Sequence, residues 1–228
     1  PLKALVLFSS GLDSVYNLLL SKKKYDKVCV LFFDYGQKAA PHEYVRVKKL
    51  SSILSLELMR IDLPWYRGLS STLLDYSRKI TEYKDKTQAD KDKKINEWVP
   101  NRNGVFVNIA AAVAESEHYD VIVIGVNKEE ALRYPDNSVK FLQGSEELLK
   151  LSTLSHPKLH SFSAELDKKN ILKDLHPLMK EYNLPIQLVW SCYESFEKMC
   201  GTCESCVRLK GALKDNGMES EWKGLFLK

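Results

Sequence analysis

Residues 3–23 read KALVLFSSGLDSVYNLLLSKK: an apolar run, a turn of small residues and an amphipathic run. The apolar run at 3–8 predicts a buried strand, and the spacing of Val15, Leu18 and Leu19 predicts a helix over 13–23. The turn between them, SSGLDS at 9–14, leads from the strand into the helix. A strand, a short turn and a helix in this order form the first part of a βαβ unit, which indicates a parallel sheet.

The rest of the chain repeats this alternation. Further strands are expected at 27–33, 56–63, 120–126 and 186–190, and further helices at 42–54, 103–119 and 166–182, with a short helix at 145–153 in a loop-rich stretch. Because parallel strands need helical crossovers, this order predicts a doubly wound, Rossmann-like α/β fold. Ligands of such sheets bind beyond the carboxyl ends of the strands. We therefore expect three loops to share one edge: SSGLDS (9–14), DYGQ (34–37) and GVNKEEA (125–131).

The composition is ordinary for a soluble globular protein. Of the 228 residues, 44% are hydrophobic and 28% charged, and the net charge is +4. The lysine-rich runs at 21–27 and 83–94 are mixed with acids, so we interpret them as solvated surface rather than as a nucleic-acid interface. Residues 77–97 as a whole are predicted to form an exposed excursion. No apolar run approaches the ~20 residues of a membrane span, and the first residues do not resemble a signal peptide, so a cytoplasmic protein is expected.

The turn at 9–14 has two interpretations. Its backbone N–H groups precede a helix, where the helix dipole favours an anion, so the turn suits phosphate. Gly11 permits a close approach of the backbone, and Ser9, Ser10 and Ser14 add hydroxyl donors. The alternative is a turn in which Ser10 and Asp13 only cap the helix. The turn alone does not decide between the two.

Four of the five cysteines are crowded near the end of the sequence, in the pattern C-x7-C-x2-C-x2-C. They are Cys192, Cys200, Cys203 and Cys206; the fifth, Cys29, is expected in the core. Four thiolates fill a tetrahedral Zn²⁺ shell and leave no open position, so the pattern predicts one structural zinc ion. An iron–sulfur cluster and disulfides are the alternatives. We expect an α/β domain over 1–190 and a small zinc-binding segment over 191–228 packed on it.

SSGLDS resembles the SGGxDS signature of the PP-loop, or N-type ATP pyrophosphatase, superfamily. Together with the cysteine pattern, DYGQ, VPNRN (99–103), GVN (125–127) and LDKKNI (166–171), nearly the whole chain resembles the 7-cyano-7-deazaguanine synthase family. The resemblance implies an adenine nucleotide alpha hydrolase-like fold and an ATP-dependent ligase. Its substrates would be 7-carboxy-7-deazaguanine and ammonia, its product 7-cyano-7-deazaguanine, the precursor of queuosine and archaeosine, and its assembly a homodimer.

The resemblance also assigns residues. ATP with Mg²⁺ would lie on the first turn, at Phe8, Ser9, Ser10, Gly11, Leu12, Asp13 and Ser14. The catalytic residues would be Asp13, Arg102 and Lys168. The substrate pocket would comprise Gln37, Asn103, Gly125, Asn127, Glu130, Tyr134 and Asp136.

The chain departs from the family pattern in two places. Ser10 stands where the signature has its first glycine, and in GVNKEEALRYPDN (125–137) Glu130 and Arg133 replace the aspartate and glycine of a D-Y-S-G-Y-P-D-C loop. Two alternatives therefore remain at this point: a PP-loop enzyme that adenylates a tRNA base or a protein terminus, and a nucleotide- or zinc-binding module without catalysis.

Overall fold

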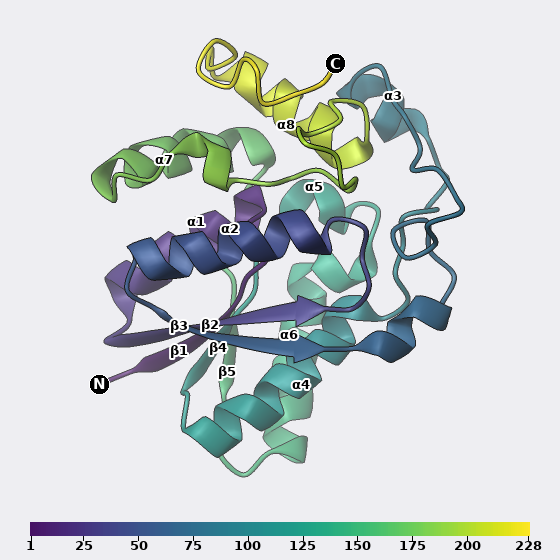
Figure 1. Ribbon diagram of the computed structural model, residues 1–228. Helices are drawn as coiled ribbons and strands as arrows, with labels where there is room; N and C mark the ends of the chain where they lie inside the picture. Colours follow the sequence, from purple (N-terminus) through teal and green to yellow (C-terminus); the bar gives the residue numbers. More distant parts are fainter.

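The computed structural model describes residues 1–228, and its centre is a five-stranded parallel sheet with the order β3-β2-β1-β4-β5 (Figure 1). The strands are β1 (Lys3–Leu7), β2 (Lys27–Asp34), β3 (Glu57–Asp62), β4 (Val121–Val123) and β5 (Lys158–His160). β1 and β2 are continuous apolar runs because both faces of the sheet are covered. The predicted doubly wound α/β fold is confirmed.

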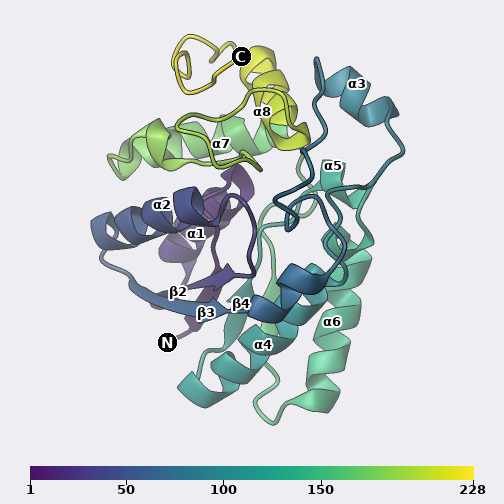
Figure 2. The ribbon, with the colours of Figure 1, turned by 45° about the vertical axis from the view of Figure 1, so that its right-hand side comes forward.

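Helices cover both faces of the sheet (Figures 1 and 2). On one face lie α1 (Leu12–Lys24) and α2 (Ala40–Ile53), with α7 (Lys168–Glu181) against α1. On the other lie α4 (Arg102–Glu117) and α6 (Val139–Ser152). β1 is paired with β2 on one side and with β4 on the other, so the chain reverses its direction of travel across the sheet between β1 and β4. Loops part at such a switch point, and a ligand can enter between them.

The predicted strand at 186–190 is wrong. This segment forms a 3₁₀ turn, η3 (Ile186–Leu188), followed by extended backbone outside the sheet. Its apolar side chains are buried because they pack on the sheet's helices, and burial without alternation does not distinguish a strand from a buried connection. Trp190 donates its backbone N–H to the carbonyl of Ser10 at 2.9 Å, so the segment forms a wall of the first turn.

The fifth strand, β5, lies in the stretch that was predicted to be loop-rich. It has three residues, of which only Leu159 is buried, so its pattern was too short to recognise. The preceding helix, α6, is longer than the expected segment at 145–153 because Ser138 caps it by accepting the N–H of Phe141 at 3.1 Å.

The charged segment 77–97 is exposed only in part. It contains a short helix, α3 (Lys86–Lys91), that packs on α8 (Glu204–Asp215) (Figure 2). Tyr83 is buried and donates its backbone N–H to the carbonyl of Thr202 at 2.7 Å. The segment therefore connects the first half of the chain to its cysteine-rich end.

Two further 3₁₀ turns and one short helix complete the chain: η1 (Pro64–Gly68), η2 (Pro135–Asn137) and α5 (Lys128–Ala131). The main hydrophobic core is one cluster of 59 residues that includes the four cysteines near α8. No helix combines the length and the apolar character that a membrane crossing would require.

Candidate active site at the carboxyl ends of the strands

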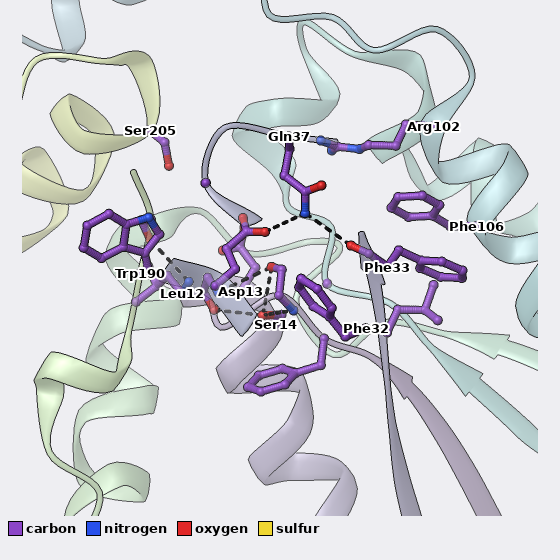
Figure 3. A pocket seen from close by; sticks show the side chains of 18 of the residues that line it. Leu12, Asp13, Ser14, Phe32, Phe33, Gln37, Arg102, Phe106, Trp190 and Ser205 are labelled. Atoms are coloured by element: carbon purple, nitrogen blue, oxygen red, sulfur yellow. Dashed lines mark hydrogen bonds between the residues drawn. The ribbon is translucent and has the colours of Figure 1, made fainter. Parts of the chain in front are cut away.

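A cavity of about 200 Å³ opens at the switch point, beyond the carboxyl ends of β1, β2 and β4 (Figure 3). Its walls come from the turn after β1, the loop after β2, the start of α4, the loop after β4, the start of α7 and the segment 190–193. Twelve of the residues predicted for the site line it: Phe8, Ser9, Gly11, Leu12, Asp13, Ser14, Gln37, Arg102, Asn103, Gly125, Glu130 and Lys168. The three loops that were expected at one edge therefore meet there.

The turn at 9–14 presents its backbone donors at the start of α1. The N–H groups of Ser9, Gly11 and Leu12 reach only hydroxyl oxygens, at 3.3 to 3.4 Å. These bonds are longer than the 2.9–3.0 Å typical of N–H donors. A phosphate oxygen, which is charged, would accept stronger hydrogen bonds from the same N–H groups than the hydroxyl oxygens do. No side chain caps α1 at Gly11, which contradicts the alternative of a simple cap. The geometry fits an anion cradle.

Ser10 lies beneath this turn rather than in the cavity. It is fully buried, its φ is +64°, and its Oγ has no hydrogen-bond partner. Backbone at this φ favours glycine, which is the residue of the superfamily signature. The turn keeps its shape with serine, at a cost of about 1–2 kcal/mol in backbone energy.

Asp13 is the centre of a charged cluster at the mouth of α1. Its Oδ2 accepts the side-chain N–H of Asn127 at 2.8 Å and lies 3.9 Å from Nζ of Lys168, which is 2.9 Å from Oε1 of Glu130. Asp13 Oδ1 is buried and has no partner. Burial raises the pKa of Asp13 to about 6, although Lys168 opposes the shift.

Lys168 remains a cation in this cluster. Burial alone would lower its pKa, but the carboxylates of Glu130 and Asp13 outweigh burial and raise it. Burial would likewise raise the pKa of Glu130, and Lys168 outweighs it in the opposite direction. Two carboxylates and one ammonium thus face the cavity with one carboxylate in excess, a balance that suits a bound divalent cation.

Gly125 lies directly against the turn at 9–14. A Cβ at this position would stand 3.0 Å from the carbonyl carbon of Asp13 and 3.0 Å from the amide nitrogen of Ser14. The loop after β4 can approach the first turn of α1 only because residue 125 has no side chain. Asn127, predicted to line the pocket, is fully buried behind it and acts on the cavity through Asp13.

Arg102 projects from the first residue of α4 into the cavity. Its Nη1 donates to the hydroxyl of Tyr35 at 3.2 Å. Burial alone would lower its pKa, but Tyr35 and Asp136 outweigh burial and raise it. The next residue, Asn103, donates its side-chain N–H to the carbonyl of Asp136 at 2.9 Å and its backbone N–H to Oδ2 of Asp136 at 3.2 Å. Asp136 therefore fixes the start of α4 and with it the guanidinium.

Gln37, which lies near Arg102 in Figure 3, holds the carboxylate of Glu43 in the cavity wall. Its Nε2 donates to Oε2 of Glu43 at 2.8 Å and to the carbonyl of Phe33 at 3.2 Å, while its Oε1 accepts the N–H of Tyr35 at 3.0 Å. Burial raises the pKa of Glu43 to about 7. The amide of Gln37 is fully used inside the protein, so Glu43 is the group of this pair with capacity left for a ligand.

A smaller recess of about 30 Å³ adjoins the cavity, and Arg102, Glu130 and Tyr193 line both. Tyr134 and Asp136, predicted for the substrate pocket, line the recess instead. Arg133, the departure from the family loop, donates to the carbonyls of Ala89 and Lys94, both at 2.6 Å. The altered loop thus holds the segment 77–97 over this recess.

The four cysteines form one buried cluster whose Sγ atoms all lie within 4.8 Å of one another. Cys200 Sγ and Cys206 Sγ are 3.8 Å apart, as two corners of a tetrahedron with ~2.3 Å zinc–sulfur bonds would be. Four backbone N–H groups point at Sγ of Cys192 or Cys200, at 3.2 to 3.4 Å. Such donors stabilise thiolates. The cluster is consistent with Zn²⁺, and Cys192 also lines the main cavity.

Comparison with known proteins identifies the family. The family model of queuosine biosynthesis protein QueC matches residues 3–217. The chain belongs to the QueC family. It is 39% identical to the 7-cyano-7-deazaguanine synthase of Pelotomaculum thermopropionicum over 96% of this chain and 100% of the relative. It is 41% identical to that of Carboxydothermus hydrogenoformans over 94% and 99%.

A solved structure supports the fold. The U34-tRNA thiolase NcsA from Methanococcus maripaludis, with its [4Fe-4S] cluster, has a TM-score of 0.50 at 16% identity and covers 98% of this chain and 68% of its own. Of the functions considered from the sequence, these comparisons support the synthase, an ATP-dependent ligase of queuosine biosynthesis.

Sequence reasoning missed part of the cavity wall. Tyr35, Glu43, Phe106, Trp190 and Tyr193 all line it. The position of Tyr35 inside DYGQ and of Tyr193 beside Cys192, the first cysteine of the cluster, was a usable signal. Trp190 was assigned to a strand, and nothing in the pattern of α4 distinguished Phe106 from an ordinary core residue.

Proposed function

We propose that the cavity binds ATP and 7-carboxy-7-deazaguanine together, with the triphosphate on the turn at 9–14 and the substrate carboxylate toward Arg102 and Lys168. The observation that carries this proposal is the meeting of Asp13, Lys168 and Glu130 beside the backbone donors of that turn. Phe8 and Leu12 line the same wall and would pack against the nucleotide.

The chemistry needs cations and N–H donors rather than a protein nucleophile. A carboxylate oxygen attacks the α-phosphorus of ATP, and pyrophosphate leaves. Ammonia then attacks the acyl carbon, AMP leaves with the oxygen, and an amide remains. A second transfer of AMP to the amide oxygen, followed by loss of AMP and two protons from nitrogen, gives the nitrile. Arg102 and Lys168 would stabilise the charge that accumulates on phosphate and on the departing AMP.

The site also suits Mg²⁺. The unpartnered buried oxygen of Asp13 is a hard ligand beside the phosphate turn, the donor type that Mg²⁺ takes from proteins. When bound, the ion would neutralise phosphate charge. Asn127 would orient the Asp13 carboxylate, and Gly125 would keep it close to the strand edge.

The remaining assignments follow from position. Gln37 would act through Glu43, Asn103 and Asp136 would orient Arg102, and Tyr134 would line the substrate end at the smaller recess. Zn²⁺ in the cysteine cluster would be structural, because four thiolates leave no open position. A homodimer and a zinc-binding unit over 191–228 on a domain over 1–190 are part of the same proposal, supported by the family resemblance.

The direct test is an ATP–pyrophosphate exchange assay with Mg²⁺ and 7-carboxy-7-deazaguanine, followed by mass spectrometry after ammonium is added. We expect exchange that depends on the deazaguanine and, with ammonium, AMP and the nitrile. Replacing Lys168 by Met should abolish exchange. Exchange that is absent from the intact protein would contradict the proposal.

A further inference from the structure

The recess beside the main cavity has an unusual lining. Its lining includes three carboxylates, Glu97, Glu130 and Asp136, one guanidinium, that of Arg102, and the aromatic side chains of Trp98, Tyr134 and Tyr193, beside Leu73, Val99 and Asn137. With a volume of about 30 Å³ it accommodates species of the size of water, and it is far too small for a nucleobase or a nucleotide.

Glu97 is the residue in this recess that the fold does not use fully. Its side chain is 4% exposed, and its Oε1 accepts the backbone N–H of Thr81 at 3.2 Å. Its Oε2 is buried and has no hydrogen-bond partner. A buried carboxylate oxygen without a donor destabilises the fold, and a bound donor removes that cost.

The other two carboxylates are already engaged. Glu130 pairs with Lys168 at 2.9 Å. Asp136 accepts from the backbone N–H of Asn103 and, at 2.9 Å, from the side chain of Asn137. Arg102, the only cation of the lining, is directed to the hydroxyl of Tyr35 at 3.2 Å. The hydrogen-bond acceptor in the recess that is left without a partner is therefore an oxygen of a negatively charged group, Oε2 of Glu97.

The aromatic rings beside Glu97 favour a small cation as the ligand of the recess. Trp98 and Tyr134 both line the recess, and their rings stack on each other with centroids 5.7 Å apart at 10°. The negative faces of aromatic rings attract small cations that have lost part of their hydration. A carboxylate oxygen with aromatic neighbours in a water-sized space is a site for a monovalent cation with N–H donors.

We propose that this recess binds ammonium, the nitrogen substrate, with Glu97 as its anionic ligand. The inference rests on the proposed function, in which ammonia attacks the activated carboxyl group. Because Arg102 and Glu130 line both spaces, an ammonium ion in the recess stands next to the position assigned to that group. The bound ammonium gives one proton to solvent before the attack, and the free lone pair of ammonia then reaches the acyl carbon. The segment 77–97 would thus supply the wall of a substrate site.

The test is the ammonium dependence of AMP and nitrile formation in Glu97→Gln. The glutamine oxygen can still accept the N–H of Thr81, so the fold should be retained. We expect the KM for ammonium to rise at least tenfold, while ATP–pyrophosphate exchange with 7-carboxy-7-deazaguanine, which needs no ammonia, keeps its rate and its KM values. Glu117→Gln serves as the matched control, because Glu117 is an exposed residue at the end of α4 without an ion pair.

The amine series gives a second readout. The intact protein should use ammonium and reject methylamine, which is too large for the recess. In Glu97→Ala the ratio of the KM for methylamine to the KM for ammonium should fall by about tenfold. An unchanged ammonium KM in Glu97→Gln, with exchange intact, would overturn the inference and leave the proposed function standing. A rise in the KM for 7-carboxy-7-deazaguanine alone would overturn it too, and would assign the recess to an edge of the base. If the intact protein shows no exchange, the proposed function itself fails.

Discussion

Gly125 lies against the backbone of Asp13 so closely that a methyl group between them would stand 3.0 Å from the carbonyl carbon. We expect Gly125→Ala to push the turn at 9–14 outward by a few tenths of an ångström. Small displacements of a binding group cost much in orientation, so the KM for ATP should rise about tenfold, with a stability loss of about 1 kcal/mol. Steady-state kinetics and urea unfolding measure the two effects.

The matched control is Gly144→Ala in α6, where a Cβ meets no atom within 4 Å. Alanine has the higher helix propensity, so this change should stabilise the protein by about 0.5–1 kcal/mol and leave the KM for ATP unchanged. Equal kinetics for the two variants would mean that the close approach at Gly125 has no role in ATP binding.

Ser10→Gly should stabilise the protein by about 1 kcal/mol, since it relieves a positive φ and removes a buried hydroxyl without a partner. The greater freedom of glycine in the unfolded chain limits the gain. Ser10→Ala removes the hydroxyl and keeps the strained φ, so it should gain less. Urea unfolding measures the stability of both variants. A loss of stability in Ser10→Gly would show that the backbone at Ser10 is not strained.

The buried carboxyl of Glu43 predicts a pH-dependent stability. Its pKa is raised by burial from 4.5 to about 7 in the folded state, so folding takes up a proton between these values. The free energy of unfolding should therefore rise as the pH falls from about 7 to 4.5, and above about 7 the charged Glu43 destabilises the fold.

Glu43→Gln mimics the protonated form. The variant should therefore be more stable than the parent protein by about 2 kcal/mol at pH 8, and the difference should vanish near pH 4. Unfolding free energies across the pH range test this, with Glu117→Gln as the exposed control. A difference that is constant with pH would show that Glu43 does not titrate in this window.

Removal of the metal should affect the cavity as well as the cysteine cluster. We expect native mass spectrometry to show one Zn²⁺ per chain, lost on strong chelation and absent from Cys203→Ala. The melting temperature should fall by about 10 °C, because a structural metal contributes folding energy. Because Cys192 also lines the cavity, exchange activity should fall with the metal. Cys29→Ala, in the sheet, should keep the ion; its loss there would contradict the assignment.

The elements that the sequence predicts well are those with long, regular patterns. β1, α1, β2 and α4 each carry enough apolar residues to identify them, and the Ser- and Gly-rich turn marks the ligand edge. The three-residue β5 lacked such a pattern. Segment 186–190 had the apolar content of a strand but no partner, because only tertiary packing distinguishes the two.

The site was predictable where chemistry lies in a motif. Asp13 and Lys168 were predicted as catalytic residues and Glu130 as a substrate-pocket residue, and the structure brings the three together. Glu97 was not recognisable, since it ends the segment 77–97, which was predicted to be exposed, and only the fold shows that one of its oxygens is buried. Long-range partners of this kind depend on how a loop folds back, which local residue patterns do not encode.

The backbone N–H of Leu12 donates to the hydroxyl of Ser191 at 3.4 Å, which joins positions 179 residues apart, and both residues line the cavity. During translation the turn at 9–14 therefore leaves the ribosome long before the segment 190–193 that contacts it. The sheet strands β1, β2 and β3 can pair early, but the cavity is completed only when this segment has emerged. Formation of the cavity thus depends on a contact between distant parts of the chain, and not on the sheet alone.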